Sequence, residues 1–193
     1  LGHEPVGVIV KVGRDVAEFQ EGDRVFVHHH APCFTCRLCR RGFFSLCEVW
    51  RASCIVPGGI AEFVKIPARN LKCDTLKIPD RMSFEDGSLI EPLACSVKAL
   101  KRARVQTGDV VLVIGLGVMG QLNALLARRY GAKTVIGADL VPYRLEKVVA
   151  MGADAAVDVS NENVEERVRE LTDGLMADRV IVGPGSLSAM SSG

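Results

Sequence analysis

The chain has 193 residues, of which 48% are hydrophobic and 24% charged, and its 24 Lys and Arg residues nearly balance its 23 Asp and Glu residues. This composition is typical of a globular protein and excludes collagen-like and intrinsically disordered chains. A formal net charge of +1 gives no electrostatic reason to expect a nucleic acid or an anionic membrane as partner. No apolar run approaches the roughly 18 residues of a membrane helix, and no signal peptide is visible, so we expect a soluble, cytoplasmic protein.

The first third of the chain has the pattern of β structure with an irregular insertion. Alternating apolar residues predict strands over residues 6–12 and 60–66, and a third strand is predicted over residues 24–27. Between them, residues 32–48 are rich in Cys, Arg and Gly and show no hydrophobic period. We therefore expect this lobe to be held together by something other than a hydrophobic core.

From about Thr107 onward, apolar strands alternate with helical segments. Apolar runs of strand length occupy residues 110–114, 134–138, 155–159 and 179–182. Helical patterns lie between them, over residues 118–130, 142–151 and a segment between Ser160, a candidate N-cap, and Gly174. This alternation predicts an α/β fold with a parallel sheet covered on both faces. We expect a first domain over residues 1–85 and a second over residues 86–193.

The cysteines point to metal chemistry. Seven is an odd number, which, without a secretory signal, argues against a disulfide framework. Four of them follow the spacing C-x2-C-x2-C-x7-C, and four thiolates suit a closed, tetrahedral, structural zinc site. An iron–sulfur cluster is the alternative, because the same thiolate shell can hold iron. The predicted ligands are Cys33, Cys36, Cys39 and Cys47.

Residues 115–120 have the sequence G-L-G-V-M-G, which matches the G-x-G-x-x-G pattern between a buried strand and a helix. In such a turn the first Gly allows the tight bend, the second lets the backbone approach a pyrophosphate, and the third allows close helix–strand contact. The helix N-terminus favours the phosphate charge. The predicted cofactor-binding residues of this segment are Gly115, Gly117, Val118, Met119 and Gly120.

A carboxylate follows this turn at the distance expected for ribose recognition. Asp139 ends the next predicted strand, about 20 residues beyond Gly120, and would accept hydrogen bonds from an adenosine ribose. Since a carboxylate there repels a 2′-phosphate, we expect NAD rather than NADP as the cofactor. Arg144, also a candidate cofactor-binding residue, weakens this preference slightly.

One His and two carboxylates suggest a second metal site. His3, Glu4 and Glu91 could contribute to a catalytic zinc shell, which typically has three protein ligands and an open position. Spacing alone leaves the alternative open, in which His3 is structural and the carboxylates never meet. The run of histidines at residues 28–30 is expected to be a solvated loop, with a metal role as the minority interpretation.

Taken together, these motifs resemble a known family. The segments GHEPVGVIVKVG, GDRVFV, PCFTCRLCRRGFFSLC, GGIAEFVKIP, EPLAC and VLVIGLGVMGQL occur in the order found in zinc-dependent medium-chain alcohol dehydrogenases. The Glu after the His and the EPLAC segment point to the polyol, threonine and sugar dehydrogenase branch. The resemblance implies a GroES-like, β-rich catalytic domain with a structural zinc lobe at residues 32–48, followed by a Rossmann domain, each of them partial.

The resemblance also implies roles for the residues. His3 would ligate catalytic zinc. Glu4 would be a ligand, as in the polyol branch, or would lie outside the ligand shell, as elsewhere in the family, and Glu91 would either ligate zinc or hold its water. The four cysteines match the structural zinc lobe. The implied activity is an oxidoreductase that moves a hydride between a small secondary alcohol, of polyol, sugar or L-threonine type, and the nicotinamide. Relatives of this kind suggest a homo-oligomer, a dimer or a tetramer.

The chain departs from the family at both ends. The family's catalytic Cys and its proton-relaying Ser or Thr lie upstream of the GHE motif, and two further Rossmann strands lie downstream of the fourth. We therefore expect an internal fragment that is inactive by itself. The competing hypothesis is a zinc-stabilised dinucleotide-binding protein without dehydrogenase activity.

Overall fold

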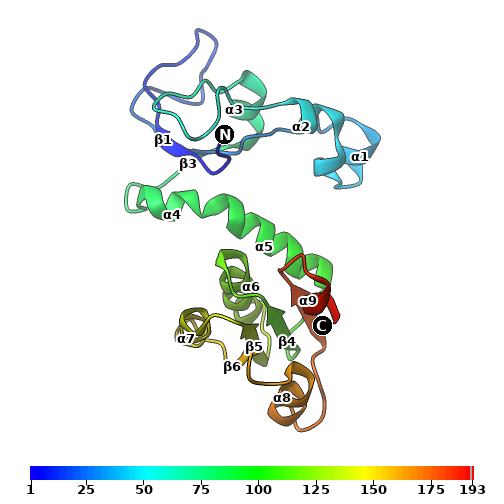
Figure 1. The fold of residues 1–193 in the computed structure, drawn as a ribbon. Coiled ribbons are helices and arrows are strands. Elements are labelled where there is room, and N and C mark those ends of the chain that lie inside the picture. The colour runs from blue at the N-terminus through cyan, green and yellow to red at the C-terminus, as the bar shows by residue number, and fades with distance from the viewer. Residues whose placement is uncertain (192) are drawn as a thin grey trace. The chain divides into compact units, whose positions relative to one another are not determined.

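The structure, a computed structural model, describes residues 1–191 and 193 (Figure 1). The chain forms two compact units, Leu1–Glu91 and Pro92–Gly193. The division falls in the first turn of helix α5 (Ile90–Ala103). Among the described residues, no helix is both long and apolar enough to cross a membrane.

The first unit contains a small antiparallel sheet in the order β1-β2-β3. Its central strand pairs with both neighbours, so that Phe26 lies opposite Val6 on one side and Leu76 on the other. Val25 and Val27 on the same strand pack with Ile55 in a small core. The strands are β1 (Val6–Val8), β2 (Arg24–Val27) and β3 (Thr75–Lys77). The helices are short: α1 (Arg37–Arg40), the 3-10 helix η1 (Phe44–Leu46), α2 (Glu48–Ala52), α3 (Ala68–Asp74) and α4 (Phe84–Ser88).

Two of the strands predicted in this unit need correction. The predicted strand 6–12 ends at Val8, and the strand predicted over residues 60–66 is wrong. Only an isolated bridge between Val56 and Lys65 forms near it. Ile60 is 80% exposed and Phe63 is 65% exposed, whereas Val64 and Ile66 pack against the small core beside β2 without forming a strand. A period of two predicts a strand only where a partner strand completes the ladder.

The second unit is a four-stranded parallel sheet with helices between its strands, as predicted. The strand order is β6-β5-β4-β7, and every neighbouring pair is parallel. The strands are β4 (Val110–Ile114), β5 (Thr134–Asp139), β6 (Ala155–Asp158) and β7 (Arg179–Val182). The helices are α6 (Val118–Arg129), α7 (Pro142–Ala150), α8 (Val164–Leu171) and α9 (Leu187–Ser191).

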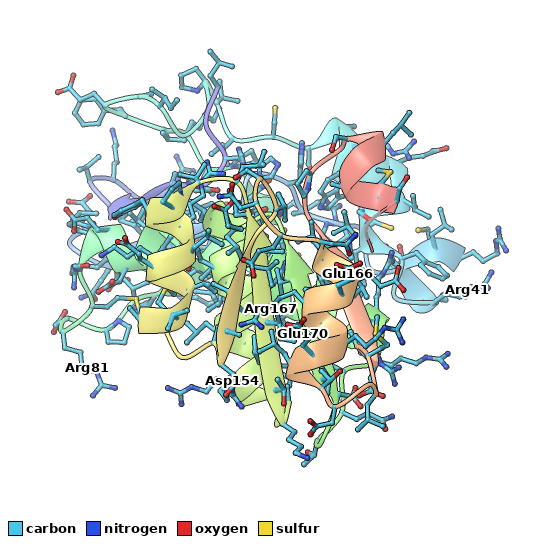
Figure 2. The ribbon with its side chains drawn as sticks, turned by 60° about the horizontal axis from the view of Figure 1, so that its bottom comes forward. Arg41, Arg81, Asp154, Glu166, Arg167 and Glu170 are labelled. Carbon is cyan, nitrogen blue, oxygen red and sulfur yellow. The ribbon has the colours of Figure 1, made fainter. Side chains whose placement is uncertain are left out.

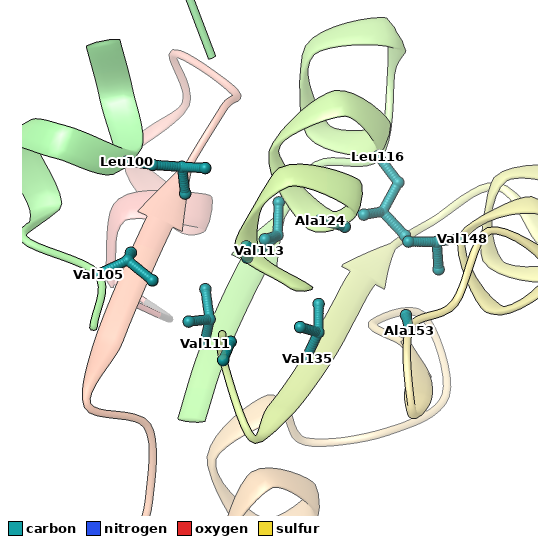
Figure 3. Close-up of a cluster of buried hydrophobic side chains, with 11 residues drawn as sticks. Leu100, Val105, Val111, Val113, Leu116, Ala124, Val135, Val148 and Ala153 are labelled. Carbon is teal, nitrogen blue, oxygen red and sulfur yellow. The ribbon is translucent and has the colours of Figure 1, made fainter. Parts of the chain in front are cut away.

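The central strand β4 explains why its sequence is apolar without interruption. Val111 and Val113 face a cluster that includes residues of α6 and α7, such as Ala124 and Val148 (Figure 3). The alternate residues of β4 face a second cluster, to which Val168 of α8 contributes. All five residues of β4 are buried, because helices cover both faces of the sheet.

Helix α5 was not predicted, although its pattern is visible in retrospect. Pro92, Ser96 and Leu100 recur every four residues and are all buried. Pro92 lies in the first turn, where its missing N–H removes no intrahelical hydrogen bond. Leu100 is fully buried in the cluster of Figure 3, so the C-terminal part of this helix belongs to the core of the second unit.

Helix α8 begins later than its predicted N-cap. Asn163 caps it, since its side-chain oxygen accepts a hydrogen bond from the N–H of Glu166 at 3.1 Å. Ser160 instead donates its N–H to the carboxylate of Asp158 at 3.0 Å and is not a cap. The exposed face of α8 carries ion pairs such as Arg167–Glu170, at 2.8 Å, and these side chains are labelled in Figure 2.

Candidate functional site

The four cysteines of the predicted zinc lobe converge in the first unit. Their Sγ atoms all lie within 4.8 Å of one another. The Sγ of Cys33 is 3.9 Å from that of Cys39 and 3.6 Å from that of Cys47. A tetrahedral zinc site with Zn–S bonds of about 2.3 Å separates its sulfurs by roughly 3.8 Å, so these distances fit zinc. They are far too long for a disulfide, whose S–S bond is about 2.0 Å.

Local hydrogen bonds shape this lobe around the sulfurs. The N–H of Cys36 donates to the Sγ of Cys33 at 3.3 Å, and the N–H of Cys39 donates to the Sγ of Cys36 at 3.4 Å. After α1 the chain reverses at Gly42, whose φ of 78° favours glycine, and returns to Cys47. Cys39 and Cys47 are buried. The close spacing of the cysteines thus produces a closed sulfur shell without a hydrophobic core.

The thiols of this shell differ in acidity. The hydroxyl of Thr35, together with nearby main-chain N–H groups, lowers the pKa of Cys33 to about 5. Burial raises the pKa of Cys39 to about 12. Protein groups alone therefore do not stabilise four adjacent thiolates, and a divalent cation is the group that compensates their mutual repulsion. The donor set fits a structural zinc ion.

The three residues of the predicted catalytic metal site also meet, although Glu91 is distant in sequence. The Nε2 of His3 lies 3.6 Å from a carboxylate oxygen of Glu4 and 4.0 Å from one of Glu91. One ligand atom from each residue lies within 4.8 Å of the other two. An imidazole nitrogen and two carboxylate oxygens are ordinary zinc ligands, and three of them leave a fourth position for substrate or water. The cluster fits an open metal site.

The histidine run at residues 28–30 is not the solvated loop that the sequence suggested. All three residues are half-buried. The ring of His29 lies edge-on to that of His3, with 5.2 Å between their centroids, and the ring of His30 lies 4.4 Å from that of Trp50. Burial, followed by the neighbouring imidazoles, lowers the pKa of His29 to about 4. Burial by itself lowers the pKa of His28, but the carboxylate of Asp74, the carbonyl oxygen of His30 and the charge of Glu91 together outweigh it, so the net shift of this pKa is upward.

In the second unit, the glycine-rich turn borders a cavity of about 630 Å³. Gly115 has a φ of 86°, which favours glycine. A Cβ at Gly120 would lie 2.8 Å from the carbonyl carbon of Gly115, so only glycine allows the helix to approach the turn this closely. At Gly117 a Cβ would meet nothing within 4 Å, which leaves that position open toward a ligand. The cavity is lined by every predicted cofactor-binding residue: Gly115, Gly117, Val118, Met119, Gly120, Asp139 and Arg144.

Asp139 is held in place at the end of β5. One carboxylate oxygen accepts a hydrogen bond from the N–H of Leu116 at 2.5 Å, and the other accepts one from Val141 at 2.9 Å. The guanidinium of Arg144 lies 3.5 Å away. Burial alone raises the pKa of Asp139, but these N–H groups and Arg144 together hold it below its ordinary value. The side chain is therefore an ionised carboxylate at neutral pH.

Comparison with known proteins agrees with this geometry. Residues 1–80 match the family model of the alcohol dehydrogenase GroES-like domain, and residues 118–193 match that of the zinc-binding dehydrogenases. The chain belongs to the zinc-dependent alcohol dehydrogenase family. Its two parts correspond to the GroES-like and Rossmann parts that the sequence predicts.

Particular relatives are similar over nearly the whole chain. A sorbitol dehydrogenase of Bombyx mori is 35% identical over 93% of this chain and 51% of its own length. An L-threonine 3-dehydrogenase of Alteromonas mediterranea is 38% identical over 89% of this chain and 49% of its own length. The chain thus spans about half the length of these relatives.

Solved structures share the fold. One from Clostridium scindens superimposes with a TM-score of 0.86 at 32% identity, covering 98% of this chain and 52% of that chain. A structure from Sinorhizobium meliloti with a TM-score of 0.82 and 27% identity was solved with NADP, covering 97% of this chain and 55% of that one. A third structure, from Escherichia coli, was solved with NADH. Its TM-score is 0.83 at 29% identity, and the match covers 98% of this chain and 56% of that chain.

Sequence reasoning missed one residue, Asn70, and one contact, that of His29 with His3, near the metal cluster. The side chain of Asn70 is fully buried and donates to the carbonyl oxygens of His28 and His29, at 3.2 and 3.1 Å. Neither the residue nor the contact has a signal in the spacing, because both depend on chain segments that only the fold brings together.

Proposed function

We propose that this chain is part of a zinc- and NAD-dependent oxidoreductase that moves a hydride between a secondary alcohol and the nicotinamide. The alcohol would be of polyol, sugar or L-threonine type. The observation that carries the proposal is the convergence of His3, Glu4 and Glu91 into one open ligand set. A solely structural zinc protein would need only the closed cysteine shell.

In this function His3, Glu4 and Glu91 would hold the metal and leave one position open. Zinc bound there supplies Lewis acidity that favours ionisation of an alcohol hydroxyl near neutral pH. Glu91, whose side chain is only 13% exposed, would orient the metal or the water beside it, while the more exposed Glu4 faces solvent. The carboxylates also offset the charge of the ion.

The second unit would seat the dinucleotide. The N-terminus of α6 and the main chain at Gly117 would receive the pyrophosphate, and Asp139 would accept hydrogen bonds from the adenosine ribose. Hydride transfer itself is chemistry that the nicotinamide supplies. Because Asp139 is ionised and would repel a 2′-phosphate, we propose NAD as the preferred cofactor, although one structural relative holds NADP.

The test uses the full-length protein. We expect two zinc ions per chain by elemental analysis, and NAD-dependent oxidation of at least one member of a panel of polyols, aldoses, L-threonine and simple alcohols. Glu91→Gln should lower kcat/KM about 10- to 100-fold, as expected for a metal-orienting group, while Glu85→Gln on exposed α4 is the matched control. Full zinc and tight NAD binding without any turnover would support the binding-protein hypothesis instead.

Cofactor choice and assembly are tested separately. Asp139→Ser should raise the kcat/KM for NADP relative to NAD, because it removes the carboxylate that repels the 2′-phosphate. An unchanged ratio would contradict the assigned role of Asp139. We also propose a cytoplasmic homo-oligomer, a dimer or a tetramer, which light scattering on the full-length protein would measure.

A further inference from the structure

Gln121, in the first turn of α6, connects two neighbouring elements of the second unit. Its Nε2 donates one hydrogen bond to the carbonyl oxygen of Leu116 in the glycine-rich turn, at 3.2 Å, and another to that of Arg144 in the first turn of α7, at 3.0 Å. Both partners are carbonyl oxygens, which only accept, so the amide can bind them only through its N–H groups. Gln121 is therefore a donor to both elements.

These contacts close a ring of polar interactions around Asp139. The N–H of Leu116 donates to a carboxylate oxygen of Asp139 at 2.5 Å, and the guanidinium of Arg144 lies 3.5 Å from the same oxygen. Leu116 and Arg144 thus each contact both Asp139 and Gln121. Asp139 and Arg144 line the cavity of the second unit, whereas Gln121 is not among its described lining residues. Gln121 therefore acts on a ligand of this cavity through the groups that it holds.

Stability alone is a poor explanation for a glutamine at this position. Its Oε1 is shielded from water and has no hydrogen-bond partner in the described part of the chain. The free-energy cost of such an atom roughly offsets the gain from the two donated hydrogen bonds. Methionine has nearly the same length and would bring no unpaired oxygen, but it cannot donate to Leu116 and Arg144. The two N–H contacts are thus what the amide contributes.

The first turn of α7 depends on this contact. Among the described residues no side chain caps the helix, whose N-cap residue is Val141. Val148, in the middle of α7, is fully buried in the apolar core, so packing fixes the helix further along. The side chain of Arg144 is 46% exposed and can turn into solvent unless Asp139 and its own main chain hold it. The hydrogen bond from Gln121 fixes that main chain.

We propose that Gln121 is a positioning residue for cofactor selectivity, which keeps the guanidinium of Arg144 on Asp139 and thereby away from a 2′-phosphate. A guanidinium free of Asp139 would be a good bidentate partner for phosphate and would favour NADP. The inference rests on the proposed function. It explains how a chain that carries Arg144 beside the ribose carboxylate can still prefer NAD.

The test measures the Kd values of NAD and NADP by calorimetric titration on the full-length protein. Gln121→Met should lower the ratio of the Kd for NADP to the Kd for NAD about three- to tenfold, the factor that one hydrogen bond is worth. The kcat at saturating NAD should not change, because Gln121 does not contact the reacting atoms. Gln106→Met, at an exposed glutamine of the same unit, is the matched control and should leave both Kd values unaltered.

A second pair of variants shows whether Gln121 acts through Arg144. In an Arg144→Met background, Gln121→Met should no longer change the Kd ratio, because the side chain that it positions is absent. An equal change of the ratio in both backgrounds would overturn the inference, since Gln121 would then act by another route.

Thermal stability of each variant separates positioning from a purely structural role. A folded Gln121→Met protein with an unaltered Kd ratio would overturn the inference while the proposed function stands. A variant that loses stability and binds both cofactors equally less well would also overturn it. A wild-type preference for NADP would contradict both the inference and the proposed cofactor. A wild-type protein that binds neither cofactor would refute the proposed function and, with it, this inference.

Discussion

The cysteine lobe of the first unit and the parallel sheet of the second unit are ordered by different means. In the lobe, residues such as Phe34 and Phe44 are exposed, and the buried side chains are chiefly the sulfurs of Cys39 and Cys47. In the sheet, every residue of β4 is buried between two hydrophobic clusters. The lobe therefore depends on a bound ion for its stability, whereas the sheet depends on apolar burial.

This contrast teaches where each region is vulnerable. Removing one zinc ligand, such as Cys47, should disorder the cysteine lobe and leave the parallel sheet folded. Adding a methyl group at Gly120 should destabilise the second unit and leave the cysteine lobe folded. The four predictions that follow test this separation in order of decreasing effect.

Loss of a zinc ligand should produce the largest change. We expect Cys47→Ser to lose one zinc ion per chain and amide protection across residues 33–47, because three thiolates no longer close the shell. Amide exchange in β4 and β5 should not change. Cys73→Ser, a half-buried cysteine outside the cluster, is the control. If Cys47→Ser keeps its full zinc content, the structural role of the four cysteines is wrong.

Methyl groups at two glycines of the same turn should act differently. Gly120→Ala forces a Cβ against the main chain of Gly115 and should lower the free energy of unfolding by about 1–3 kcal/mol or more. Gly117→Ala meets no atom within 4 Å, so it should retain stability while weakening NAD binding. Chemical denaturation and calorimetric titration measure the two effects. Equal stability of both variants would argue against the close helix–strand approach.

Acid should destabilise the second unit partly through Asp139. Its folded-state pKa is depressed by main-chain N–H groups and Arg144 despite its burial, so its stabilisation is fully present above the unfolded pKa of about 3.9. That contribution is lost as the pH falls below 3.9 through the folded pKa. Asp139→Asn should flatten the pH dependence of unfolding in that window, whereas Glu146→Gln on the exposed face of α7 should not. Parallel slopes for wild type and Asp139→Asn would contradict this.

The smallest effect should come from the surface of α8. Arg169 and Glu165 form an exposed ion pair one helical turn apart, at 2.9 Å. Solvent screens such pairs, so Glu165→Gln should cost no more than about 0.5 kcal/mol of unfolding free energy. Thermal denaturation at low and high salt measures it. A loss of several kcal/mol would mean that α8 is held by its charges rather than by Val164 and Val168.

The sequence predicted elements well where local pattern and burial agree. The run Val110–Ile114 predicted a strand buried on both faces, and β4 confirms it, because a parallel strand covered by helices needs an apolar residue at every position. Pattern and structure disagree at residues 60–66, because the alternating apolar residues there have no partner strand and form no strand themselves. Helix α5 was missed because Pro92 and Ser96 conceal an otherwise regular buried stripe.

By itself, the sequence determined the local chemistry of this protein: the cysteine spacing that closes a sulfur shell and the glycine spacing that bends the chain before α6. These features act over a few residues, so their geometry follows directly from covalent reach and backbone freedom. Tertiary structure alone decided which distant groups meet. It brings Glu91 close to His3. It also places the ring of His29, one of three consecutive histidines, next to that of His3, because packing and the buried amide of Asn70 determine where this loop lies.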